Sequence, residues 1–176
     1  MTQTDSLRPM VHAALFVALI SVGAFIAIPI GPVPIVLQNM FVLLAGLVLG
    51  PAWGTACVAV YLLIGMAGLP VFAGGTSGIG KLFGPTGGYL LGYLPAVLVT
   101  GAISNAPGKT LFRDILAMIA GSVVLYGIGV PWLKLAFAVS WGQALTLGLL
   151  PFLFGDAVKI AAAVVMARNI RPLLRK

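Results

Sequence analysis

The chain has 176 residues, of which 61% are hydrophobic and only 7% are charged. An ordinary soluble domain carries roughly 25% charged residues, so this composition excludes a soluble domain and is typical of an integral membrane protein. The net charge of +7 does not indicate nucleic-acid binding, because the basic residues lie at the ends of apolar segments, where they set membrane orientation and contact anionic lipid.

The first apolar segment, residues 11–30, is about 20 residues long, which is enough to cross the hydrocarbon core of a bilayer. It exceeds the roughly 7 to 15 residues of a signal-peptide core and lacks a clear A-x-A cleavage site, so we expect a retained span. Ala14 and Ala18 lie four residues apart within it. This spacing lets two membrane helices approach closely, either inside one bundle or against a partner.

A proline-rich segment, "IPIGPVPIVLQNM", leads from the first span to Gln38 and Asn39. The two amides offer donors and acceptors just inside the membrane, although they are equally compatible with a simple helix start. Two spans are predicted next, at 36–50 and 52–68, separated by Gly50-Pro51. Because proline cannot continue a helix, we expect these two spans to form a tight hairpin.

The loop at 69–86 is rich in glycine and contains Gly74, Gly75 and Gly78. Glycine allows the backbone to approach a ligand closely, but it is also common in flexible surface loops. From Gly75 the segment nearly matches the phosphate-binding loop G-x-x-x-x-G-K-[ST], with Leu82 where a hydroxyl is required. A membrane helix precedes it instead of a strand, so we expect no nucleotide site here.

Two more spans are predicted at 87–104 and 111–130. Tyr89 and Tyr93 lie four apart near the start of the first, so they share one helix face that lines a pocket or meets the membrane interface. Asp114 follows Arg113 at the start of the second. We interpret Asp114 as an interfacial charge.

The last predicted span, 149–168, contains Asp156 and Lys159. Three residues apart, they lie on one face of a helix and are able to pair. Each costs several kcal/mol to hold alone in hydrocarbon, on the order of 2.5 to 3.5 even by insertion scales. Intramembrane charges of this kind are candidates for a functional site, and a purely structural ion pair is the alternative.

The distribution of basic residues predicts the orientation. Arg8, Lys109, Arg113 and the four C-terminal basic residues fall on one side of the six spans, whereas only Lys81 and Lys134 fall on the other. We therefore expect an all-α, single-domain membrane protein with six transmembrane helices and both termini in the cytoplasm. The sequence contains no H-E-x-x-H motif, no cysteine cluster and no convincing Ser-His-acid set, so we expect neither a metal site nor an enzyme.

Three separated segments carry a family resemblance: "GPVPIVLQN" at 31–39, "GLPVFAGGTSGIGKLFGPTGGYLLGY" at 68–93 and "LPFLFGDAVK" at 150–159. They resemble the bacterial biotin transporter family BioY, the substrate-binding S components of energy-coupling factor transporters. The similarity runs in order over essentially the whole chain. It implies a six-helix membrane protein that holds biotin near the outer surface beneath glycine-rich loops.

The resemblance also implies roles for individual residues. Ala14 and Ala18 match the small-x-x-x-small pattern through which such S components contact the coupling subunit. Val36 departs from the family pattern, which commonly has threonine there, and Phe154 stands where proline is common. The substrate-binding residues that the resemblance implies are Gln38, Gly74, Gly75, Gly78, Tyr89, Asp156 and Lys159.

The implied partners are biotin as ligand, a transmembrane coupling subunit and a pair of cytoplasmic ATPases, in a bacterial inner membrane. The chain itself is expected to bind no cofactor, because the partners hydrolyse ATP, and self-association is left open. An S component for another small vitamin is the nearest alternative, and a membrane-embedded enzyme is a more distant one. Which end of biotin meets Asp156 and Lys159 does not follow from the sequence.

Overall fold

The structure is a computed structural model, and it describes residues 3–29, 31–106 and 110–174. Ile30, which ends the first predicted span, and the basic residues Lys109, Arg175 and Lys176 lie outside the described residues. The described elements are, in chain order, α1 (Gln3–Phe25), β1 (Ala27–Ile28), β2 (Ile35–Val36), α2 (Gln38–Met66), α3 (Gly80–Phe83), α4 (Gly87–Asn105), α5 (Leu111–Phe137), α6 (Trp141–Gly148) and α7 (Leu150–Leu174).

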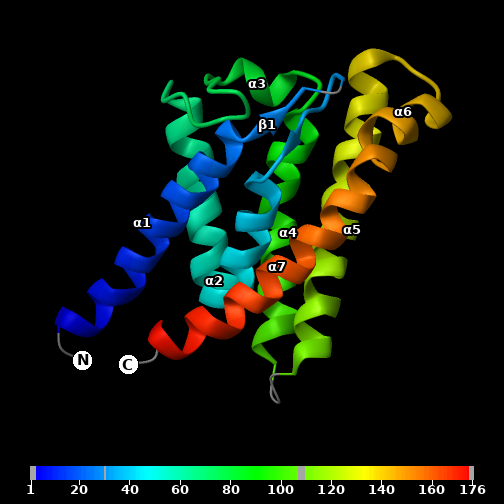
Figure 1. The fold of residues 1–176 in the computed structure, drawn as a ribbon. Coiled ribbons are helices and arrows are strands. Elements are labelled where there is room, and N and C mark those ends of the chain that lie inside the picture. The colour runs from blue at the N-terminus through cyan, green and yellow to red at the C-terminus, as the bar shows by residue number, and fades with distance from the viewer. Residues whose placement is uncertain (1–2, 30, 107–109, 175–176) are drawn as a thin grey trace.

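Five helical segments among the described residues are long and apolar enough to cross a membrane. They correspond to the six predicted spans because α2 contains two of them, and the predicted all-α membrane fold is confirmed. Within α2, Gly50 has φ of 79° and ψ of −177°, which breaks the helix into halves at 38–49 and 51–66. Figure 1 shows the chain reversing at this point, so the predicted hairpin is present.

Small residues allow the two halves of α2 and the neighbouring α4 to pack closely. A Cβ on Gly54 would lie 3.1 Å from the Cα of Gly46, and a Cβ on Gly101 in α4 would lie 2.6 Å from the nitrogen of Pro51. Close backbone approach of this kind is a common source of helix association in membranes, where burial of apolar surface drives little. The hairpin and α4 therefore form the centre of the bundle.

The remaining helices surround this centre. Helix α5 packs against α4, α7 contacts both α2 and α5, and α1 packs mainly against α2 at the periphery. Figure 1 shows β1, α3 and α6 at one end of the bundle, which we call the loop end. The start of α1 and the end of α7 lie together at the opposite end, which we call the terminal end.

Two local features differ from the sequence prediction. The first helix ends at Phe25, and the chain continues as β1, which pairs antiparallel with β2 so that Ala27 lies opposite Val36. A short strand pair is thus added to the helical fold in the proline-rich segment. Helix α6 was not predicted either; it is only eight residues long, and Ser140 and Gln143 form a capping box at its start.

Candidate functional site

A cavity of about 310 Å³ lies at the loop end of the bundle. Its volume falls at the lower end of the range for small-molecule sites. Helices α2, α4, α5 and α7 contribute its inner walls, and the chain around β2 and α3 contributes its outer walls. Half of the residues that line it are apolar: Pro32, Val33, Pro34, Val36, Phe72, Ala73, Pro85, Leu90, Leu125 and Phe152.

The inner end of the cavity is formed by a buried polar cluster. Asp156 accepts hydrogen bonds from Asn39 Nδ2 at 2.9 Å and Lys159 Nζ at 3.2 Å, and the hydroxyl of Tyr126 donates to its other oxygen. Lys159 also donates to Asn39 Oδ1 at 3.0 Å. Asp156 and Lys159 are 6% and 7% exposed, so this ion pair is almost completely removed from solvent.

The geometry of the cluster explains how two charges are accommodated in an apolar bundle. A buried ion pair is tolerated when additional hydrogen bonds satisfy its remaining lone pairs and protons, and here Asn39 bonds to both charged partners. Asn39, Tyr126 and Lys159 all line the cavity. A ligand that enters it therefore meets both donors and acceptors at the inner end.

Tyr89 lines the cavity from α4, and its ring is held in place by close packing. Its hydroxyl donates to the carbonyl of Gly148 at 2.8 Å, and its ring meets the ring of Tyr126 edge to face at 6.3 Å. A Cβ on Gly129 would lie 2.5 Å from the ring of Tyr89. Glycine at this position therefore makes room for the tyrosine side chain.

Gln38 lines the cavity from the start of α2 and is 1% exposed. Its Nε2 donates to the hydroxyl of Tyr61 at 2.8 Å, and that hydroxyl donates to the carbonyl of Val71 at 2.9 Å. Gln38 is therefore connected through Tyr61 to the loop after α2. The structure brings Gln38, Tyr89 and Lys159 to one cavity, and Asp156 is paired with Lys159, whereas their contact with a ligand stays a prediction.

Gly74, Gly75 and Gly78 are absent from the described lining of the cavity. All three have positive φ, of 69°, 72° and 96°, which is a conformation that favours glycine. The amide of Gly74 donates to the carbonyl of Ala24 in α1 at 3.1 Å, and that of Gly78 donates to Gly65 in α2 at 2.8 Å. The glycines therefore shape the loop and anchor it to two helices, and their contact with a ligand stays a prediction.

The segment from Gly75 to Leu82 lacks the architecture of a phosphate-binding loop. Helix α2 precedes it, and the helix that begins within it, α3, has only four residues. Leu82 occupies the hydroxyl position of the motif and is buried at 8% exposure. Lys81, by contrast, is exposed and lines the outer part of the cavity.

Ala14 and Ala18 lie on the exposed side of α1. Among the described residues, neither alanine is packed inside the bundle, so the structure does not favour the internal-packing alternative. Several large apolar side chains share this side of α1: Leu7, Val11, Leu15, Val22 and Phe25. The side is available to lipid or to a partner helix.

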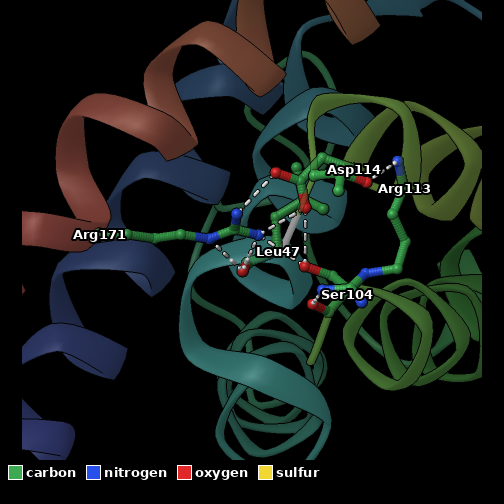
Figure 2. Close-up of polar contacts among 6 residues, drawn as sticks. Leu47, Ser104, Arg113, Asp114 and Arg171 are labelled. Atoms are coloured by element: carbon green, nitrogen blue, oxygen red, sulfur yellow. Dashed lines mark hydrogen bonds and ion pairs between the residues drawn. The ribbon is translucent and has the colours of Figure 1, made fainter. Parts of the chain in front are cut away.

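A second buried polar cluster lies near the terminal end and overturns the interfacial interpretation of Asp114. Asp114 is 2% exposed and forms a bidentate ion pair with Arg171 of α7, at 2.6 and 2.9 Å. Arg171 also donates to the carbonyl of Leu47 at 3.1 and 2.7 Å and to Ser104 Oγ at 2.6 Å. Figure 2 shows the guanidinium among these groups, so one side chain joins α2, α4, α5 and α7.

The sequence explains why Leu47 accepts these bonds. Its carbonyl would normally accept from the amide four residues later, but that residue is Pro51, which has no N–H. Such helix-end carbonyls need another donor when they are buried. The guanidinium of Arg171 supplies two N–H groups and caps the first half of α2.

No group of three or more His, Cys, Asp or Glu side chains able to hold a metal occurs among residues 3–29, 31–106 and 110–174. The polar residues that line the cavity carry amide, hydroxyl and ammonium groups, and the carboxylate of Asp156 bonds to two of them. These groups suit recognition of a small molecule with a polar, hydrogen-bonding part and an apolar part.

Comparison with known proteins identifies the family. The family model described as BioY family matches residues 1–176. The chain belongs to the BioY family. Among its relatives in that family, the probable biotin transporter BioY of Pyrococcus horikoshii is 46% identical over 158 residues, covering 90% of this chain and 93% of the relative. The biotin transporter BioY of Thermotoga maritima is 41% identical over 168 residues, covering 95% and 98%.

A solved structure is also similar over almost the whole chain. The crystal structure of the S component for biotin from an ECF-type ABC transporter has a TM-score of 0.90 and 31% sequence identity to this chain, covering 98% of this chain and 95% of that one. The resemblance carried by the three sequence segments is thus confirmed. The chain is a multi-pass membrane protein of the BioY family.

The two departures from the family pattern lie in very different places. Val36 lines the cavity, so the threonine hydroxyl common in the BioY family is missing from its wall. Phe154 is 84% exposed on α7 and points away from the bundle core. The first departure changes the wall of the cavity, whereas the second does not reach it.

Two members of the inner polar cluster were not predicted as site residues. Asn39 was noted as an amide inside the membrane, but its bonds to Asp156 and Lys159 span 117 and 120 residues of sequence. Tyr126 lies in an apolar span and belongs to no recognisable motif. The one sequence feature that could have indicated a site residue was a polar hydroxyl within that span. The fold, not sequence spacing, brings both to Asp156.

Proposed function

We propose that this chain is the biotin-binding S component of an energy-coupling factor transporter and mediates biotin uptake. The observation that carries the proposal is the cavity whose inner end holds the Asn39–Asp156–Lys159 cluster while its walls are apolar. Biotin has a ureido ring with N–H donors and a C=O acceptor, attached to an apolar bicycle and tail. The cavity offers a complement to each part.

The named relatives support this assignment. The relatives in P. horikoshii and T. maritima bear the names of biotin transporters, and the similar solved structure is an S component for biotin. They are transport proteins and not enzymes, in agreement with the sequence analysis. We propose that this chain likewise carries out no reaction, binds no cofactor and leaves ATP hydrolysis to its partners.

Biotin binding by the isolated chain tests the proposal. Titration of biotin into the detergent-purified protein should show saturable binding with one site. Asp156→Asn and Lys159→Met should weaken binding by about tenfold or more, because each leaves a buried polar partner unsatisfied. Phe154→Leu on the outer face of α7 is the matched control and should bind as the wild type does.

Competition separates biotin from the nearest alternative. A panel of other small vitamins at tenfold excess should not displace biotin if the site is specific. Displacement by one of them, with tighter binding than biotin, would assign the chain to that vitamin. Absence of measurable biotin binding by the folded wild-type protein would remove the proposal.

We propose further that a transmembrane coupling subunit contacts α1 at Ala14 and Ala18, with a pair of ATPases on its cytoplasmic side. The exposure of both alanines on a peripheral helix supports this, because small residues allow another helix to approach. Ala14→Trp and Ala18→Trp should abolish biotin uptake by cells while leaving binding by the purified chain unchanged. Normal uptake by both variants would move the contact elsewhere.

The proposed location is the bacterial inner membrane with both termini in the cytoplasm. The described ends of the chain lie at the same end of the bundle, opposite to the cavity, which supports an outward-facing binding site. Cysteine-accessibility labelling of a single cysteine placed at each terminus, in a Cys57→Ala background, should require membrane permeabilisation. Labelling of either terminus in intact cells would contradict this orientation.

A further inference from the structure

The side-chain amide of Gln38 has two possible orientations, and the hydrogen bonds around Tyr61 select one of them. Tyr61 is fully buried in the second half of α2 and is not among the described residues that line the cavity. Its hydroxyl donates to the carbonyl of Val71 at 2.9 Å. A phenol carries a single O–H proton and a backbone carbonyl only accepts, so this bond uses the one donor that Tyr61 has.

The bond to Val71 determines how Tyr61 interacts with Gln38. With its proton directed at Val71, the Tyr61 oxygen is left as an acceptor, and Gln38 Nε2 donates to it at 2.8 Å. The opposite amide orientation would either place two acceptors against each other or take the hydroxyl proton away from the carbonyl of Val71. Both arrangements leave a buried polar group unpaired, which is costly, so the nitrogen side of the amide faces Tyr61.

The oxygen side of the Gln38 amide is left for the cavity. Gln38 lines the cavity, and its Oε1 has no hydrogen-bond partner among the described residues. This atom is nevertheless not one of the fully buried atoms without a partner in the described part of the chain, so it stays accessible. An accessible carbonyl oxygen on an otherwise buried side chain is suited to accept a hydrogen bond from a ligand.

Packing holds Tyr61 in the position that this pair of bonds requires. Its ring meets the ring of Phe72 edge to face at 5.7 Å, with 71° between the two planes. A Cβ on Gly65 would lie 2.3 Å from the Phe72 ring, so glycine makes room for the two aromatic side chains. The Tyr61 hydroxyl therefore meets Gln38, which begins the other half of α2, from a fixed place in the core.

We infer that Tyr61 is a positioning residue for ligand binding, which fixes the Gln38 amide with its oxygen towards the cavity. This inference rests on the proposed function for the identity of the ligand. Tyr61 acts through Gln38, and Gln38 makes the contact. This part of the wall therefore selects ligands that carry a hydrogen-bond donor over ligands that present only acceptors to it.

Selective labelling of glutamine with ¹⁵N tests the amide orientation without any ligand. The chain contains three glutamines, Gln3, Gln38 and Gln143, and Gln38→Met assigns the side-chain signals of Gln38. In the wild type its NH₂ protons should exchange with solvent far more slowly than those of Gln143, which is exposed and uses its Oε1 to accept from Ser140. Tyr61→Phe should raise the exchange rate of Gln38 by about tenfold or more. Equally fast exchange of Gln38 and Gln143 in the wild type would overturn the inference.

A double-mutant cycle on biotin affinity tests whether Tyr61 acts through Gln38. Tyr61→Phe keeps the ring and should weaken biotin binding by about threefold to tenfold, as expected for one hydrogen bond. In a Gln38→Met background the same change should have no further effect, because the amide that it positions is gone. Cys57→Ala is the matched control: it removes a buried donor from the same half of α2, but the acceptor is Ala13 of α1, so binding should be unchanged.

The cycle separates positioning from a purely structural role. An equal loss of affinity for Tyr61→Phe in both backgrounds would overturn the inference and show that Tyr61 acts only through the stability of the fold. Unchanged affinity of Tyr61→Phe in the wild-type background would overturn it too. Absence of biotin binding by the wild type would refute the proposed function instead, and the glutamine signals would still report the orientation of Gln38.

Discussion

Replacement of Arg171 by methionine should destabilise the bundle strongly while leaving the cavity unchanged. The change removes the bidentate bonds to Asp114 and the two bonds to the carbonyl of Leu47. Asp114 would keep only Ser104 as its described side-chain partner, at 3.1 Å, in a site that is 2% exposed. A buried charge left without its partner is the costly element.

The expected magnitude follows from the loss of one partner of a buried ion pair, which costs about 3–5 kcal/mol. For a protein of this size, each kcal/mol lowers the melting temperature by about 2–4 °C, so a loss of roughly 6 to 20 °C is expected. Leu47 adds to the cost because Pro51 cannot supply an alternative donor. Lysine at this position should recover only part of the loss, since it lacks the planar fork of donors.

Cys57 provides the assay. It is the single cysteine of the chain and is 1% exposed, so a thiol-reactive fluorogenic dye reports its exposure as the detergent-solubilised protein is heated. Arg168→Met is the matched control, because Arg168 is exposed on the same helix. Equal melting temperatures for Arg171→Met and Arg168→Met would refute the reasoning, and biotin affinity below the melting range should be the same in both.

Three further outcomes follow from the packing and from the loop. Gly101→Ala should lower stability by about 1–3 kcal/mol in the same melting assay, because the added Cβ would collide with the backbone at Pro51. Gly127→Ala should be neutral or stabilising, because no atom lies within 4 Å of the position of its Cβ. Tyr126→Phe should weaken biotin binding about tenfold in titrations, since Asp156 loses a hydroxyl donor, and unchanged affinity would show that this bond is dispensable. The isolated chain should show no ATP binding by equilibrium dialysis, because Leu82 is buried where a phosphate loop needs a hydroxyl, and saturable binding would contradict this.

The sequence was sufficient for the features that depend on local chemistry. The lengths of the apolar segments predict where the membrane-spanning helices lie, because every backbone group in lipid must be paired within its own segment. Gly50-Pro51 predicts the hairpin within α2, and the spacing of Asp156 and Lys159 indicates that they are able to pair, as they do at 3.2 Å. These inferences need no knowledge of how distant segments pack.

The features that sequence analysis missed depend on long-range packing. Asp114 and Arg171 are 57 residues apart, and the separation between Asn39 and Asp156 is 117. Because Arg113 is adjacent in the sequence, Asp114 was interpreted as an interfacial charge. The partner that the structure shows is Arg171, which lies on α7 near the other end of the chain. Only the fold could show that Asp114 is buried and which distant residues bond to each of the two carboxylates.

The two polar clusters also restrict how the bundle is able to move. Helices α2 and α7 each contribute to both, through Asn39 and Leu47 on one helix and through Asp156 and Arg171 on the other. The α7 pair is 15 residues apart, or about 22 Å along a helix. A slip of α7 by one turn, about 5.4 Å, would break the bonds at both ends at once. The two clusters, at separate points along α7, therefore fix its register against α2 and oppose any sliding of one helix along the other.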